Sequence, residues 1–81
     1  MEITVYELTP VIIDKIKKAK IVHFNLCFSE NIDFIQDTNI EEIYFELYSN
    51  YKFPLNNLPH TLKTLTLPRG FTHKIDMFPP N

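Results

Sequence analysis

The sequence is poor in the residues that build covalent, metal and phosphate sites. Its 81 residues contain one cysteine, Cys27, one glycine, Gly70, and no tryptophan. A single cysteine excludes an intramolecular disulfide and the usual zinc patterns, and it fits a reducing compartment. A single glycine excludes a glycine-rich phosphate loop. Because Cys27 lies between Leu26 and Phe28, we expect it to be a buried small hydrophobe rather than a reactive thiol.

Charge and hydropathy exclude two classes of partner. The formal net charge of -2 leaves no electrostatic footprint for nucleic acid. The basic cluster at residues 15–20 is typical of the solvated side of a helix. No apolar stretch is long enough to span a bilayer, and the first residues lack the pattern of a signal peptide. The sequence therefore predicts a soluble cytoplasmic protein that binds neither nucleic acid nor membrane.

The first 18 residues predict a strand followed by a helix. Apolar and polar residues alternate over residues 3–6, which is the period of a half-buried strand. Thr9 is placed to cap a helix that begins at Pro10. The apolar residues of that helix then share one face: Ile12, Ile13, Ile16 and Ala19. The run over residues 21–26 predicts a second strand.

Beyond the helix, a pattern of about twenty residues recurs. Three sets share the spacings two, four, four and three: Val22, Phe24, Phe28, Ile32 and Ile35; Phe45, Leu47, Tyr51, Leu55 and Leu58; Leu65, Leu67, Phe71, Ile75 and Phe78. The middle unit has a second possible register, on Ile40, Ile43 and Phe45. Chance alignment of aromatic-rich segments is the competing explanation, and five matched positions in three units argue against it.

These units predict an α/β fold built as a short leucine-rich-repeat-like solenoid. One unit has a single hydrophobic edge, so it buries that edge only by stacking on its neighbours. We expect a single domain over residues 1–81. In it, residues 1–18 form an N-terminal strand–helix cap, and residues 19–81 form about three repeats with a small parallel sheet.

The C-terminal part of the chain resembles the FNIP repeat, a leucine-rich-like repeat of social amoebae and giant DNA viruses. The family places a leucine-proline pair before a strand of the form Leu-x-x-Leu-x-Leu. Leu58-Pro59 matches that pair, and the strand pattern is matched by Leu62, Leu65 and Leu67. The resemblance covers residues 51–78 well and residues 19–50 weakly.

The segment that follows the strand in the family has the form Phe-Asn-x-Pro-Ile. Phe71 and Ile75 match its ends, but Thr72 and Lys74 replace its asparagine and proline. The resemblance implies a curved repeat stack that binds proteins, with no catalytic residues and no cofactor. For a viral protein, the cytoplasm would be that of the host.

The alternation of the strands predicts which side chains face outward on the sheet. Those residues are His23, Asn25, Tyr44, Glu46, Tyr48, Thr64 and Thr66. Repeat proteins commonly bind partners on such a face, so we expect another protein to contact these positions. Tyr44 and Tyr48 are the expected anchors, because exposed tyrosines are favoured hot-spot residues. The competing explanation is that aromatic and threonine side chains simply suit strands.

The sequence predicts no catalytic, metal or cofactor site. No histidine is spaced with a second histidine or cysteine as metal ligands would be. His73 and Asp76 lie close in sequence, but no nucleophile stands beside them. The expected function is a non-catalytic protein–protein interaction module. The alternative is a self-associating structural unit, or a remnant of a longer array, because a short stack leaves an open strand at each edge.

Overall fold

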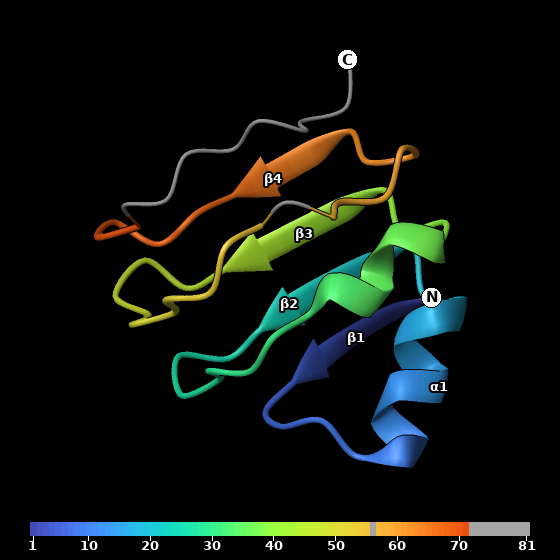
Figure 1. Cartoon of the computed structure of the whole chain (residues 1–81), viewed down its shortest axis with the longest axis horizontal. Helices are drawn as coiled ribbons and strands as arrows, with labels where there is room; N and C mark the ends of the chain where they lie inside the picture. The colour runs from blue at the N-terminus through green and yellow to red at the C-terminus, as the bar shows by residue number, and fades with distance from the viewer. Residues whose placement is uncertain (56, 72–81) are drawn as a thin grey trace.

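A four-stranded parallel sheet runs through the computed structural model, which describes residues 1–55 and 57–71 (Figure 1). Its strands, in chain order, are β1 (Glu2–Val5), β2 (Ile21–Phe24), β3 (Glu42–Phe45) and β4 (Thr64–Thr66). Helix α1 (Pro10–Lys18) connects β1 to β2, and the 3-10 helix η1 (Asp33–Asp37) lies between β2 and β3. The predicted α/β class and the small parallel sheet are confirmed.

Each strand pairs with the strand that follows it in the chain. Glu2 is opposite Ile21, Ile21 is opposite Glu42, and Glu42 is opposite Thr64. Equivalent strand positions are therefore 19, 21 and 22 residues apart. A parallel pair needs a long return connection, and each of these separations leaves room for one.

Helix α1 begins where the sequence predicts and ends at Lys18, so Ala19, expected on the helix, is its C-cap instead. The Ile12 backbone N–H donates to Thr9 Oγ1 at 3.2 Å, and Pro10 takes the first helical position. At the other end, the Ala19 N–H donates to the Ile16 carbonyl at 3.1 Å. Ile16 and Ala19 are buried, which places the predicted apolar face against the core.

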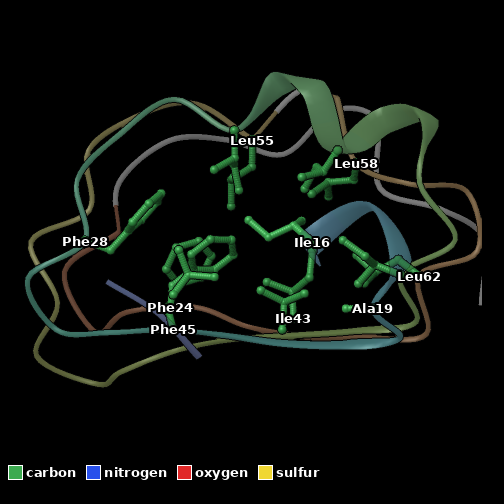
Figure 2. Close-up of a cluster of buried hydrophobic side chains, with 14 of the residues drawn as sticks. Ile16, Ala19, Phe24, Phe28, Ile43, Phe45, Leu55, Leu58 and Leu62 are labelled. Atoms are coloured by element: carbon green, nitrogen blue, oxygen red, sulfur yellow. The ribbon is translucent and has the colours of Figure 1, made fainter. Parts of the chain in front are cut away.

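The core lies between the sheet and the return connections. Figure 2 shows side chains from the strands and from α1 meeting those of the segment after β3, namely Phe24, Ile43, Phe45, Ile16, Leu55 and Leu58. The Phe24 and Phe45 rings stack with centroids 4.9 Å apart, and Phe28 stacks on Tyr51 at 5.9 Å. Such aromatic pairs add about 0.5 to 1.5 kcal/mol each beyond the burial of their area.

The structure decides between the two registers of the middle unit. Because Val22 pairs with Ile43 and Phe24 with Phe45, the unit registers on Ile40, Ile43 and Phe45. The register that put Leu47 in the strand is wrong, since Leu47 lies in the turn after β3 with 54% of its surface exposed. The turns after β2 and β3 have the same length, since the Phe28 N–H donates to the Asn25 carbonyl and the Ser49 N–H to the Glu46 carbonyl. The difference lies after the turn: Phe28 itself is the buried aromatic residue of the first unit, whereas Tyr51 comes two residues after Ser49 in the second.

The prediction that Cys27 is buried is also wrong. Strand β2 ends at Phe24, and Cys27 lies exposed in the turn that follows. The Asn25 side chain accepts a hydrogen bond from the Cys27 N–H at 3.0 Å, and the Phe28 N–H donates to the Asn25 carbonyl at 2.9 Å. This turn interrupts the strand alternation, so Leu26 is exposed as well.

Several predicted features fall elsewhere in the chain. Strand β1 occupies Glu2–Val5 rather than residues 3–6. The predicted positions Ile75 and Phe78, and the pair His73 and Asp76, lie outside the described residues. Within the described ranges, no helix is long and apolar enough to cross a membrane.

Candidate functional site

The outer face of the sheet, meaning the side away from the core, carries two rows of side chains. The strand register aligns the first row as Thr4, His23, Tyr44 and Thr66. The second row is Glu2, Ile21, Glu42 and Thr64. The threonines are exposed and the two rings are half-buried, so solvent reaches this face.

A stacked pair of rings lies at the centre of the outer face. His23 on β2 and Tyr44 on β3 have ring centroids 5.0 Å apart and planes inclined by 16°. His23 Nε2 is hydrogen-bonded to the Glu2 carboxylate, and the Tyr44 hydroxyl donates to the Glu42 carboxylate. Each ring is therefore held by its neighbour and by an acidic side chain.

The acidic side chains also set the charge state of the tyrosine. The hydrogen bond to Glu42 raises the pKa of Tyr44 above its usual 10.0, with smaller contributions from burial and from the negative charges of Glu42 and Glu2. A raised pKa favours the protonated phenol. At neutral pH the Tyr44 hydroxyl therefore stays a hydrogen-bond donor to the Glu42 carboxylate.

This arrangement has the parts of a recognition surface. The rings offer apolar area held in one orientation, the threonine hydroxyls donate and accept hydrogen bonds, and the carboxylates accept them. Within residues 1–55 and 57–71, no group of three or more histidine, cysteine, aspartate or glutamate side chains is placed to hold a metal ion.

The structure brings four of the predicted binding residues together and separates three. His23, Tyr44, Thr64 and Thr66 share the outer face. The other three lie beyond the strand ends, where alternation no longer applies: Asn25, Glu46 and Tyr48. The Asn25 side chain closes the turn after β2, and the Glu46 carboxylate accepts the Leu26 N–H at 2.7 Å. The prediction that Tyr44 and Tyr48 anchor one partner on one face therefore loses its geometric basis.

Sequence reasoning missed Glu2, Thr4 and Glu42. All three follow the same two-residue alternation as His23 and Tyr44, so the parity signal was present in the sequence. The contact of Glu2 with His23 depends on the pairing of β1 with β2, which parity alone does not give, whereas Glu42 contacts Tyr44 within β3.

A row of charges borders the outer face where the strands begin. Lys20 and Lys63 flank Glu41, with Nζ to carboxylate oxygen distances of 3.8 and 3.5 Å. The two lysines are exposed and Glu41 is half-buried, so solvent screens both pairs and each stabilises the fold by less than about 1 kcal/mol. The row repeats at equivalent positions before β2, β3 and β4, which follows from the register of the sheet.

No protein family, curated protein or solved structure matches this chain.

Proposed function

We propose that this chain is a non-catalytic protein-interaction module that binds another protein with the outer face of its sheet. Its architecture is a short solenoid of FNIP-type, leucine-rich-like repeats. Two observations support the solenoid. Consecutive strands pair at intervals of 19, 21 and 22 residues, and an apolar residue precedes each later strand at the same spacing. These three residues are Ala19, Ile40 and Leu62, all buried.

The observation that carries the proposal is the His23–Tyr44 stack. Both rings are partly exposed, yet each is fixed before a partner arrives, His23 by Glu2 and Tyr44 by Glu42. Binding normally costs about 0.5 to 1.5 kcal/mol for each side chain that must be immobilised, and fixed rings avoid most of that cost. Tyrosine is also enriched among the residues that dominate protein interfaces.

The proposed compartment is a reducing cytoplasm. Cys27 is exposed and is the only cysteine of the chain. Exposed thiols persist where glutathione and thioredoxin keep them reduced.

Affinity capture from cytoplasmic extract tests the proposal. The wild-type chain is compared with the double variant His23→Ala/Tyr44→Ala, and with Val11→Ala as the control. Val11 is 63% exposed on α1, outside the sheet. The proposal predicts a partner that wild type and Val11→Ala retain and the double variant loses.

Circular dichroism of every bait separates lost binding from lost folding. If the double variant keeps the wild-type spectrum and still captures the same partner, the outer face is not the binding surface. Equal loss in Val11→Ala would do the same, because that residue is not on the face.

A second candidate function, self-association, is favoured by the edge at β1. This strand ends the sheet on one side within the described chain, so its outer backbone groups have no strand partner there. Exposed apolar side chains lie close to it in sequence, with Met1 at 63% and Tyr6 at 65%. Strand edges of this kind are templates for pairing with a second copy. Light scattering over a hundredfold range of concentration distinguishes the candidates, since only self-association predicts a mass that rises.

A further inference from the structure

Three turns follow β2, β3 and β4 where these strands end, all on the same side of the molecule (Figure 1). Each is closed by a backbone N–H donating to the carbonyl three residues earlier, at 2.9, 3.0 and 3.2 Å for Phe28, Ser49 and Phe71. The Arg69 N–H also donates to the Leu47 carbonyl at 2.8 Å, which joins the last two turns. The register of the sheet therefore continues into its turns.

At one equivalent position of the three turns, the side chains differ greatly in size. Cys27, Tyr48 and Gly70 occupy equivalent places, each immediately before the residue that closes the turn. Tyr48 has a large side chain there and Gly70 has none. A Cβ placed on Gly70 would meet no atom within 4 Å. The missing side chain leaves open space beside the tyrosine ring.

That space is a shallow groove of about 400 Å³ between the turns after β3 and β4. Its lining comprises Leu47, Tyr48, Ser49, Asn50, Arg69 and Gly70. Leu47 and Tyr48 give it an apolar wall, since they are 54% and 68% exposed. The groove is separate from the His23–Tyr44 stack, because it lies beyond the ends of the strands.

The groove has one charged group, and that group is positive. Arg69 is the single arginine of the sequence, and it has no ion pair within the described residues. Glu46, the acidic residue closest to Tyr48 in sequence, accepts the Leu26 N–H of the preceding turn. Its carboxylate is thus engaged away from Arg69. An arginine that forms no ion pair in the described part of the chain, and that lies beside exposed apolar side chains, complements a carboxylate with an apolar neighbour.

We infer that this groove binds an acidic segment of a protein partner, in which an aspartate pairs with Arg69 and an adjacent bulky apolar side chain packs on Tyr48 and Leu47. The inference rests on the proposed function and specifies the chemistry of the partner. The groove lies beyond the C-terminal end of β3, the strand that carries Tyr44.

Peptide titration monitored by NMR tests this inference on the full chain. The probes are two blocked peptides, acetyl-Gly-Phe-Asp-Gly-amide and its counterpart with asparagine in place of aspartate. We expect the aspartate peptide to shift the backbone amide signals of Tyr48, Arg69 and Gly70, and to bind about tenfold more tightly than the asparagine peptide. We expect Arg69→Gln to reduce the affinity for the aspartate peptide to that of its counterpart.

Variants at Gly70 separate occlusion from misfolding. Gly70→Ala should bind like wild type, because its Cβ enters open space, whereas Gly70→Phe should fill the groove and abolish the shifts. Lys15→Gln, which removes an exposed cation on α1, is the matched charge control and should change nothing. Equal affinity for the two peptides would overturn the inference, as would shifts that survive in both Arg69→Gln and Gly70→Phe.

The two proposals fail in different experiments. Capture that depends on His23 and Tyr44, with no peptide binding at Arg69, would sink the groove and leave the outer face in place. Peptide binding at the groove together with capture indifferent to His23 and Tyr44 would sink the outer-face proposal instead.

Discussion

The imidazole of His23 and the phenol of Tyr44 stack with their centroids 5.0 Å apart, although 21 positions separate the two residues in the chain. Their contact exists because β2 and β3 pair in parallel at that interval, and because both side chains have the outward parity of their strands. A shift of one residue in this pairing would turn one of the two rings toward the core. The stack is thus a direct consequence of the repeat register.

The Glu42 carboxylate should control the ionisation of Tyr44. Its hydrogen bond is the largest cause of the raised Tyr44 pKa, and the charge of Glu2 is the smallest. We expect Glu42→Gln to bring the pKa of Tyr44 back toward 10.0, and Glu2→Gln to lower it less. The ring carbon shifts of Tyr44, followed by NMR through alkaline pH, report both values. A Tyr44 titration that is identical in wild type and Glu42→Gln would contradict the contact.

The same shift makes a prediction about stability at high pH. A folded-state pKa raised above the unfolded value means that the folded chain holds the phenol proton more tightly. The stabilisation is therefore complete below pH 10 and is lost as the pH rises through the raised pKa of Tyr44. Urea unfolding measured upward from pH 9 should show less loss of stability in Glu42→Gln than in wild type. A steeper loss of stability in Glu42→Gln than in wild type would contradict the stabilising role of the hydrogen bond between Glu42 and Tyr44.

The two registers of the middle repeat predict opposite results at two positions. Ile43 is fully buried whereas Leu47 is 54% exposed. Ile43→Val should lower the free energy of unfolding by about 0.5 to 1.5 kcal/mol. Leu47→Ala, although it removes more atoms, should change that free energy by less than about 0.5 kcal/mol. Urea denaturation measures both, and a larger loss for Leu47→Ala would restore the rejected register.

Removing the Tyr51 hydroxyl should stabilise the protein. Tyr51 is packed among aromatic rings, and its hydroxyl has no hydrogen-bond partner of normal geometry within the described residues. Burial raises the pKa of Tyr51, and the negative charge of Asp33 raises it further. The Ile32 backbone lowers this pKa by a smaller amount. A buried unpaired polar group costs about 1 to 3 kcal/mol.

We therefore expect Tyr51→Phe to raise the free energy of unfolding by about 1 kcal/mol. The control is Tyr48→Phe, which removes a hydroxyl from a side chain that is 68% exposed and should have no measurable effect. A destabilised Tyr51→Phe would contradict this prediction and mean that the hydroxyl is hydrogen-bonded in the folded protein.

Local signals in the sequence were sufficient for the start of the fold. Thr9 and Pro10 mark the start of α1, because capping depends on neighbours three residues away. Alternation placed Val22 and Phe24 in the core for the same reason. A slip of two residues in the middle unit was harder to detect, since it preserves the face of every strand residue.

The features that could not be predicted from the sequence depend on where each strand ends and on which strands pair. Leu26 and Leu47 continue the inward alternation of their strands in the sequence, but turns begin before them and expose both. The hydrogen bond between Glu2 and His23 and the groove beside Gly70 depend on neighbours set by the strand register, whereas Glu42 and Tyr44 lie on the same strand. Alternation along a strand predicts on which face of the sheet a side chain lies, whereas its neighbour on the next strand depends on the register between the two strands.

Methyl NMR of the threonines tests the central claim most directly. Thr4, Thr64 and Thr66 have exposed side chains on the outer face, and Val11 on α1 supplies reference methyl groups away from the sheet. When the captured partner is added to methyl-labelled chain, the account predicts that the three threonine signals shift or broaden while those of Val11 stay unchanged. Changes confined to Val11, with all three threonine signals unmoved, would contradict binding through the outer face.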